Sequence, residues 1–254
     1  MDNSEIYNSE KVVSAYALKK EALSRPEQLI LDIIKIAGYS SMLDIGVGTG
    51  RTTKFFADCF ENYFATDQSD KMIRFCENRF GETNHRKFQV CDARKMECFQ
   101  TSSFDFIFFS FNGIDCVNHE GRIEILKEIH RLLNPNGKFA FSSHNLFNIP
   151  RLFSIQFPKN PLNFIPEIRR WKQINKENPS VSELYGLNYA IIKDGDLDFS
   201  TKYYYIHPAY QILQLKETGF NKIRILSLDS GKELLENTFW KNIKDKWLYY
   251  ICEK

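Results

Sequence analysis

One short segment constrains the fold of this chain more than any other: an apolar run followed by glycines at alternate positions. Residues 42–45 (Met-Leu-Asp-Ile) have the composition of a buried parallel strand, and Gly46, Gly48 and Gly50 follow directly. A helical pattern then begins at Thr52. Strand, glycine turn and helix in this order are typical of open α/β sheets, which bind ligands at the carboxyl ends of their strands. Because glycine has no Cβ, the backbone can turn tightly there and a ligand can lie against it.

The spacing of the glycines separates this turn from two common nucleotide-binding turns. The dinucleotide fingerprint requires G-x-G-x-x-G, but Arg51 stands where the third glycine belongs, and the Gly-Lys-Ser/Thr ending of a P-loop is missing. A glycine turn that binds no ligand is the alternative. Asp44 lies at the end of the strand, where a carboxylate needs a hydrogen-bond partner. It can accept from the N–H groups of the turn or reach a cationic amine of a ligand.

Composition limits the class of protein. With 254 residues, 43% of them hydrophobic, the chain can form one large α/β domain, and its net charge of +2 gives no general attraction to nucleic acid or membrane. The N-terminus lacks the apolar run of a signal peptide, and no stretch reaches the roughly 20 apolar residues of a membrane span. The six cysteines are scattered and form no C-x-x-C motif, so we expect reduced thiols, a cytoplasmic location and no metal site.

Strand and helix patterns alternate along most of the chain, which predicts a parallel sheet covered on both faces. After a segment that is helical from about Ser9, helices are predicted at 24–38, 52–60, 69–76, 121–133 and 208–219. Further strands are predicted at 62–66, 87–91, 104–111, 138–143, 220–228 and 246–252, with a turn at 134–137 before the fifth strand. The alternation is absent from 146–186, and the strand-like segments 187–193 and 197–206 flank Asp194-Gly195 as a β-hairpin.

Several motifs together resemble the class I S-adenosylmethionine (SAM)-dependent methyltransferases. These are D-x-G-x-G-x-G at 44–50, an acid at the end of each of the next two strands (Asp67 and Asp92), and L-x-P-x-G at 133–137. The resemblance extends from about residue 24 to the C-terminus, apart from an insertion. It implies an α/β fold with a seven-stranded, mostly parallel sheet in the order 3-2-1-4-5-7-6. It also implies that the last strand is antiparallel, that helices cover both faces, and that the insertion forms a lid with a β-hairpin.

The resemblance also divides the chain into four parts. Residues 1–23 are expected to form an N-terminal lid segment, 24–145 the SAM-binding core, 146–206 an acceptor-binding insertion or lid, and 207–254 the C-terminal part of the core.

The cofactor implied is SAM, with S-adenosylhomocysteine (SAH) as product, and the resemblance assigns it a set of residues. The glycines of the turn would lie against the methionine part, Asp44 would hold its amino group through the loop, and the backbone around Ser110 would line the same part. Asp67 would accept both ribose hydroxyls. The adenine would lie among Gln68, Met72, Asp92 and Ala93. Taken singly, Asp67 and Asp92 also fit a helix cap or a solvated loop acid.

Candidates for the acceptor site follow the fourth and fifth strands. His144 has the position and chemistry of a general base, with a structural histidine as the alternative. Asn112 and Asp115 lie near the end of the fourth strand, although Asp115 also fits a cap of the next helix. Strand alternation puts Tyr203 and Tyr205 on one face, toward the acceptor or in a structural stack. From the N-terminal segment, Tyr16 is expected to close over the site.

The acceptor is predicted to be a small molecule. Six Lys or Arg residues in 146–186 favour an anionic acceptor, with a solvated helix face as the alternative. Phe-Ser-Phe-Asn at 109–112 lacks the Asn/Asp-Pro-Pro-aromatic signature of enzymes that methylate nucleic-acid bases. The function predicted is therefore methyl transfer from SAM to a nitrogen or oxygen atom of a small molecule. The alternatives are other SAM chemistry, a non-catalytic SAM-binding partner, or an NAD-dependent oxidoreductase, against which Arg51 argues.

Overall fold

A computed structural model describes residues 3–18, 21–235 and 242–254. The helices are α1 (Ser4–Tyr7), α2 (Glu10–Ala17), α3 (Arg25–Ala37), α4 (Thr53–Phe56), α5 (Asp70–Phe80), α6 (His119–Leu132), α7 (Ile149–Leu152), α8 (Phe164–Glu177), α9 (Val181–Leu184) and α10 (Pro208–Glu217). The strands are β1 (Ser41–Ile45), β2 (Asn62–Asp67), β3 (Arg86–Val90), β4 (Phe104–Phe109), β5 (Leu133–Asn145), β6 (Tyr189–Ile192), β7 (Tyr203–Ile206), β8 (Asn221–Ser227), β9 (Glu233–Leu234) and β10 (Trp247–Glu253).

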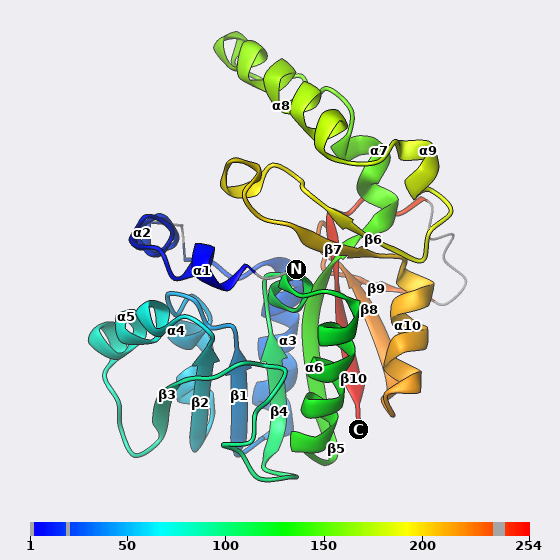
Figure 1. Cartoon of the computed structure of the whole chain (residues 1–254). Coiled ribbons are helices and arrows are strands. Elements are labelled where there is room, and N and C mark those ends of the chain that lie inside the picture. The colour runs from blue at the N-terminus through cyan, green and yellow to red at the C-terminus, as the bar shows by residue number, and fades with distance from the viewer. Residues whose placement is uncertain (1–2, 19–20, 236–241) are drawn as a thin grey trace.

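The main path of the sheet runs β3-β2-β1-β4-β5-β10-β8-β9 (Figure 1). Strand β10 pairs antiparallel with both β5 and β8, whereas β3, β2, β1, β4 and β5 pair in parallel. When the hairpin strands β6 and β7 and the short strand β9 are left out of the count, β8 and β10 are the sixth and seventh strands. The first seven strands of the path then have the predicted order 3-2-1-4-5-7-6, and the predicted fold class is confirmed. Two additions were not predicted: β9 extends the edge at β8, and β7 joins the β6–β7 hairpin to the end of β5.

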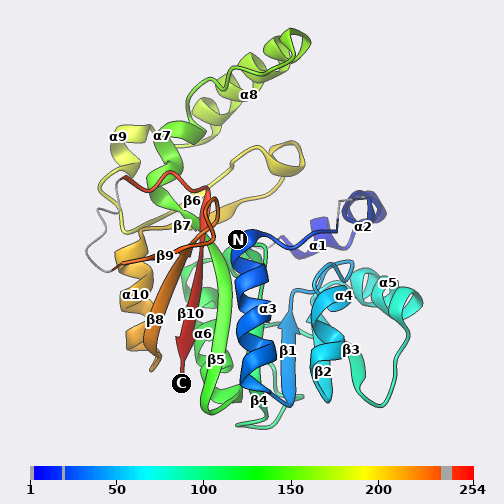
Figure 2. The same cartoon turned by 180° about the vertical axis from the view of Figure 1, so that it is seen from behind.

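Successive side chains along each strand point to opposite faces of the sheet, and both faces are apolar. In β4, Ile107 and Phe109 pack in one cluster with α6 and α10, whereas Phe106 and Phe108 pack in the other with α3 and α4. Helices consequently cover both faces, α6 and α10 on one and α3 and α4 on the other (Figures 1 and 2). A strand buried on both faces reads as a nearly continuous apolar run. That property identifies 104–109 as a central strand.

Local sequence signals fix the beginning and end of the helices beside the glycine turn. Ser24 and Glu27 form a reciprocal capping box at the start of α3, and Gly38 ends this helix with a left-handed backbone (φ +64°). Ser69 caps α5 by accepting a hydrogen bond from the N–H of Met72. These three features were predicted from the sequence and are confirmed.

Several predicted boundaries are wrong. The helix predicted at 52–60 is only the single turn of α4, followed by a 3-10 turn at Ala57–Cys59. The turn predicted at 134–137 lies within β5, where the register with β4 shifts and Asn136 is left-handed (φ +63°). The hairpin exists, but its second strand begins at Tyr203, and a 3-10 segment at Asp196–Phe199 replaces the predicted two-residue turn.

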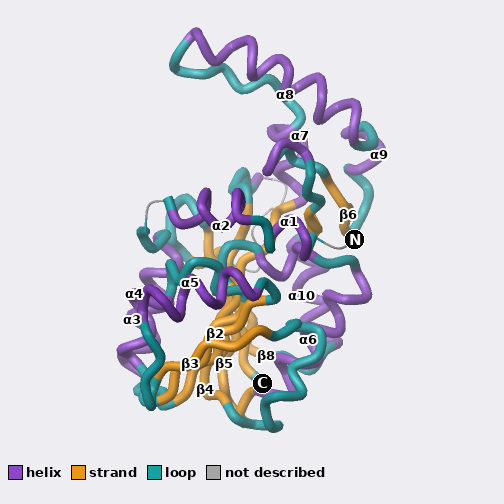
Figure 3. The backbone as a smooth tube through the Cα atoms, turned by 60° about the vertical axis from the view of Figure 1, so that its left-hand side comes forward, coloured by secondary structure: helices purple, strands orange, loops and turns teal. Residues whose placement is uncertain are grey.

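The insertion forms a small layer of its own beyond the end of the sheet. Side chains from α7, α8, α9, β6 and β7 share a third apolar cluster, in which Ile174 and Ile192 are fully buried. Figure 3 shows α8 extending away from the sheet, while the N-terminal helices α1 and α2 lie over the strand ends. The insertion and the N-terminal segment thus lie on the side of the sheet to which the glycine turn belongs.

Candidate functional site

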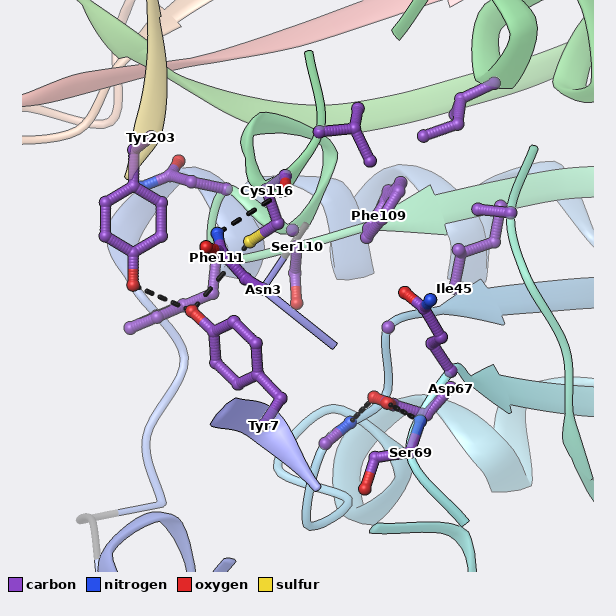
Figure 4. A pocket seen from close by; sticks show the side chains of 18 of the residues that line it. Asn3, Tyr7, Ile45, Asp67, Ser69, Phe109, Ser110, Phe111, Cys116 and Tyr203 are labelled. Atoms are coloured by element: carbon purple, nitrogen blue, oxygen red, sulfur yellow. Dashed lines mark hydrogen bonds between the residues drawn. The ribbon is translucent and has the colours of Figure 1, made fainter. Parts of the chain in front are cut away.

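A cavity of about 370 Å³ lies at the carboxyl ends of the parallel strands. Its lining includes Ile45 at the end of β1, Asp67 at the end of β2, Phe109 at the end of β4 and His144 near the end of β5. Figure 4 shows Asp67 and Ser69 at one side and Tyr7, Tyr203 and Cys116 at the other. We call the first side the glycine end and the second the aromatic end.

Most of the residues predicted from the sequence line this cavity. Those that do are Tyr16, Gly46, Gly48, Asp67, Gln68, Met72, Asp92, Ala93, Ser110, Asn112, His144 and Tyr203. Asp44, Asp115 and Tyr205 are not among the lining residues, and they lie behind it in contacts described below. Gly50 does not line the cavity either, and a Cβ there would clash with the Phe80 ring.

The glycine turn is held to the end of β2 by hydrogen bonds to one carboxylate. The N–H of Gly48 donates to Asp67 Oδ2 and the N–H of Ser69 donates to Asp67 Oδ1, each at 2.9 Å. Burial raises the pKa of Asp67, and the backbone donors at Ser69 and Gly48 partly offset this rise. A Cβ at Gly46 would lie 2.6 Å from the Phe109 ring, but a Cβ at Gly48 would meet no protein atom within 4 Å. The space beside Gly48 is therefore open toward the cavity.

Asp44 lies beneath the turn rather than in the cavity. It is fully buried and accepts hydrogen bonds from the hydroxyls of Thr52 (2.5 Å) and Tyr63 (2.7 Å) on Oδ2. Its Oδ1 has no partner among the described residues. Burial raises the pKa of Asp44 to about 6, and the two hydroxyl donors counteract this only in part. Asp44 thus links the end of β1 to Thr52, which follows the glycine turn, and to Tyr63 on β2.

Arg51 occupies the position at which a dinucleotide-binding turn has its third glycine. Its guanidinium bonds both carboxylate oxygens of Glu27, at 2.6 and 2.9 Å, and Glu27 is fully buried. The same guanidinium lies 4.3 Å from the ring centre of Phe111 and donates to Ser110 Oγ at 3.3 Å. Arg51 thus joins the start of α3 to the glycine turn and to the loop after β4.

Asp92, the second predicted acid, is bonded to a residue that the sequence analysis missed. Arg94 donates from Nε to Oδ1 and Oδ2 at 3.0 Å and from Nη2 to Oδ2 at 2.6 Å. Arg94 also lines the cavity. The Asp-x-Arg spacing is the signal that could have identified this pair.

At the other end of the cavity, the structure brings His144 and Asp115 together. The backbone N–H of His144 donates to Asp115 Oδ2 at 2.7 Å, and its Nδ1 lies 2.8 Å from the same oxygen. Asn112 Nδ2 lies 3.2 Å from His144 Nε2. A proton on Nδ1, shared with the carboxylate, leaves the Nε2 lone pair to face the Asn112 amide. The sequence had predicted these three residues as separate candidates.

Asp115 does not cap the next helix, because Asn118 caps α6 by accepting from the N–H of Gly121. Its other oxygen accepts from Arg122 Nη1 at 2.5 Å and from Ser143 Oγ at 2.7 Å. Asp115 and Arg122 are both fully buried. The sequence analysis missed Arg122, although its position one turn before Ile125 and Leu126 puts it on the apolar face of α6.

The predicted alternation in β7 is confirmed. The rings of Tyr203 and Tyr205 lie 5.3 and 4.6 Å from the His144 ring, between centroids, whereas Tyr204 points to the other face and bonds His119 at 2.8 Å. Tyr203 lines the cavity, and Tyr205 is buried behind it against His144.

The N-terminal segment completes the aromatic end. The hydroxyls of Tyr7 and Tyr203 lie 2.7 Å apart, and the ring of Tyr16 packs edge-on against Tyr7. Burial raises the pKa of both Tyr7 and Tyr16. The sequence pointed to Tyr16 but gave no signal for Tyr7. Further lining residues missed from the sequence are Asn3, Cys116, Asp194, Asp196 and Trp247.

The six basic residues of 146–186 are absent from the lining of this cavity, as far as the structure describes the chain. Arg170, for example, bonds Glu167 on its own helix and the carbonyl of Leu152. The expectation of an anionic acceptor rested on these residues and loses its support.

Within the residues that the structure describes, no group of three or more His, Cys, Asp and Glu is arranged to hold a metal ion. None of their helices is both long and apolar enough to cross a membrane.

Comparison with known proteins identifies the fold. Residues 42–137 match the family described as "Methyltransferase domain". The chain is similar to the malonyl-[acyl-carrier protein] O-methyltransferase of Marinomonas sp. (strain MWYL1), with 25% identity over 118 residues. That match covers 46% of this chain and 42% of the relative, less than half of its length.

Solved structures match over nearly the whole chain. A SAM-dependent methyltransferase from Clostridium acetobutylicum is 15% identical with a TM-score of 0.65, over 98% of this chain and 96% of that one. The phosphoethanolamine N-methyltransferase 2 of Haemonchus contortus, in complex with SAM, is 17% identical with a TM-score of 0.59, over 99% of this chain and 59% of that one.

Proposed function

We propose that the chain is a class I SAM-dependent methyltransferase, which it resembles over residues 42–137 and in overall fold, and that it transfers the methyl group of SAM to a nitrogen or oxygen atom of a small molecule bound at the aromatic end of the cavity. The observation that carries the proposal is the continuity of the cavity. One lining joins the glycine turn and Asp67 to a histidine held by a buried carboxylate, His144.

The residues of the glycine end fit SAM, the cofactor of this family. A cavity of about 370 Å³ falls within the range of small-molecule sites. The space beside Gly48 is open, and the Asp67 carboxylate, although it accepts two backbone N–H groups, keeps lone pairs for further donors. We assign the ribose hydroxyls to Asp67, the adenine to Gln68, Met72 and Ala93, and the methionine part to Gly46, Gly48 and Ser110.

When bound, SAM supplies an electrophilic methyl group on a sulfonium. The protein's own contribution is then to align the acceptor, exclude water and accept a proton. We assign proton acceptance to His144 Nε2. Asp115 holds the ring by accepting from its Nδ1 and its backbone N–H, and an acceptor N–H or O–H that displaces the Asn112 amide would meet the Nε2 lone pair.

The N-terminal segment and the insertion form the cover in this proposal. Asn8 Oδ1 accepts from Ser69 Oγ at the glycine end (2.8 Å), and Asn3 Nδ2 donates to the carbonyl of Lys202 beside β7 (2.9 Å). The segment therefore spans the cavity from one end to the other. Opening and closing of such a cover admits ligands and removes water from the reacting groups.

Two measurements test the proposal. Calorimetry should detect binding of both SAM and SAH, and incubation with methyl-labelled SAM and pools of small molecules should yield a labelled product. His144→Gln keeps a polar side chain that cannot act as a base, and we expect it to lower turnover and flatten the pH–rate profile while SAH affinity stays the same. Binding of NAD with no heat for SAM or SAH would refute the assignment. SAM binding with no methylated product would instead favour a non-catalytic role.

A further inference from the structure

The aromatic end of the cavity carries acids without matching cations. Asp194 and Asp196, on the loop between β6 and β7, both line it. Of the Lys and Arg side chains in the described part of the chain, Arg94 alone lines the cavity, and it bonds Asp92. A negatively charged acceptor would therefore meet carboxylates here with no cation to balance its charge.

Hydrogen bonds hold the two acids in place. Tyr205 donates its hydroxyl to Asp194 Oδ2 at 3.0 Å, and Tyr203 donates to Asp196 Oδ2 at 2.9 Å. The N–H of Asp196 donates to Asp194 Oδ1 at 3.0 Å. Each contact is a donor to a carboxylate oxygen, and an ionised carboxylate accepts up to about four hydrogen bonds. Both acids thus retain capacity for further donors.

A second feature of the same end also calls for a donor. Asn112 lines the cavity, is only 5% exposed, and its Oδ1 has no hydrogen-bond partner among the described residues. A buried acceptor without a donor is costly. A carboxylate ligand cannot supply the missing donor, whereas an N–H group can.

The walls around these oxygens are aromatic. Tyr7, Tyr16, Phe111 and Trp247 line the cavity, and the rings of Phe111 and Trp247 lie 5.7 Å apart between centroids. Aromatic faces attract cations and cost little to desolvate. Aromatic rings combined with fixed carboxylates are the surroundings that suit an alkylammonium group.

We infer that the methyl acceptor is an amine that is cationic at neutral pH, bound by Asp194 and Asp196 and directed by them toward His144. This inference rests on the proposed function and names the acceptor class for the same site. It replaces the anionic acceptor that the basic residues of the insertion had suggested.

The reaction balances without any further reactant. The ammonium first gives a proton to His144 Nε2, which leaves a lone pair on nitrogen. A bond then forms between that nitrogen and the methyl carbon while the carbon–sulfur bond breaks, and its electron pair stays on sulfur as SAH. The product is an N-methylammonium, and the proton on His144 passes to solvent.

Matched probes test the acceptor class by binding rather than by turnover. Calorimetry on the SAH-saturated protein compares 2-phenylethylamine, 2-phenylethanol and phenylacetate, and then butylamine, 1-butanol and butyrate. In at least one series we expect the amine to bind about tenfold more tightly than its alcohol and carboxylate, which is the scale of a charge-assisted hydrogen bond. Equal binding within each series, preference for an alcohol or a carboxylate, or no amine binding would overturn the inference.

Variants on one loop provide the matched control. Asp194→Asn and Asp196→Asn should each weaken amine binding several-fold and leave alcohol binding and SAH affinity unchanged. Asp198→Asn lies on the same loop, but its side chain is 97% exposed and does not line the cavity, so it should change nothing. An equal effect at all three positions would refute the role of Asp194 and Asp196. If SAH itself fails to bind, the proposed function fails; if SAH binds and a carboxylate or alcohol is preferred, only the amine class fails.

Discussion

Replacing Asp115 by asparagine removes one negative charge from a fully buried polar network. Asp115 accepts from Arg122, Ser143 and twice from His144, and it is fully buried. An amide of the same shape has one acceptor oxygen in place of two. Wherever its NH2 group points, it faces groups that themselves donate, and the Arg122 guanidinium loses its counter-charge.

The expected cost follows from the burial of both partners. Breaking a buried ion pair by removing one partner typically costs about 3–5 kcal/mol. Arg122 keeps neutral acceptors in Ser143, Gln211 and the carbonyl of Ile114, so we expect about 3 kcal/mol, the lower end of that range. Adding Arg122→Met to Asp115→Asn should recover part of the loss, because the unpaired charge is then removed.

Urea unfolding at neutral pH measures these values. Asp105→Asn is the control: Asp105 also accepts four hydrogen bonds, from Ser40, Ser41 and Asn134, but it has no cationic partner and lies half-buried at the surface. We expect it to cost less than half as much. A loss below about 1 kcal/mol for Asp115→Asn, or a double variant as unstable as the two single losses added, would refute the reasoning about buried charge.

Three further predictions concern the glycine end. Glu27→Gln should cost about 3 kcal/mol in urea unfolding because it leaves Arg51 unpaired beneath the turn, whereas Glu21→Gln, in a more exposed ion pair, should cost less than about 1 kcal/mol. Burial raises the pKa of Asp44 to about 6 from an ordinary 3.8, so the folded state keeps a proton that the unfolded chain loses. The contribution of Asp44 to stability should fall by about 2 kcal/mol as pH rises from 4 to 7, and unfolding of Asp44→Asn, compared with wild type at each pH, should lack that fall. Asp67→Asn should weaken SAH binding in calorimetry by about 1–3 kcal/mol. The amide replaces a carboxylate that accepts from the N–H of Gly48 and, in our proposal, from the ribose hydroxyls.

The sequence predicted those features whose causes are local. The capping box at Ser24, the left-handed Gly38 and the glycine turn each depend on a few neighbouring residues, so their patterns are readable directly. The order of the central strands was predictable for a different reason. Alternating strand and helix patterns and the terminal acids Asp67 and Asp92 matched a fold with a known topology.

Features that depend on left-handed backbone at non-glycine residues could not be predicted. Phe111 and Asn112 have φ +50° and +60°, so β4 ends at Phe109 although the apolar pattern continues. Leu197, Asp198 and Phe199 are also left-handed, and the strand predicted there is replaced by a turn. Such conformations are uncommon for non-glycine residues; Asn and Asp adopt them more often than most, but local sequence does not tell which Asn or Asp will do so. Both segments border the cavity, where strained backbone is most often found.

The charge composition of the insertion was misleading because a count of basic residues does not tell where their side chains point. The basic residues of the insertion suggested an anionic acceptor, but none of the six is among the described residues that line the cavity, and Arg170 bonds Glu167 instead. Of the acids that line the aromatic end, Asp194 was predicted only as part of a turn, and Asp196 was not singled out. The charge of a site depends on the few side chains that face it, and here the loop between β6 and β7 brings two acids to the cavity.

The aromatic end also depends on contacts between segments far apart in the chain. Tyr7 meets Tyr203 across 196 positions, and Asn3 reaches the carbonyl of Lys202 across 199. The same N-terminal segment bonds Ser69 at the glycine end through Asn8. A ligand that moves this segment at one end therefore changes the hydrogen bonds of Tyr203, which also donates to Asp196. We therefore expect cofactor binding to change the position of Asp196, the carboxylate proposed to bind the acceptor, through the Tyr203 hydroxyl, and no part of that coupling is local in sequence.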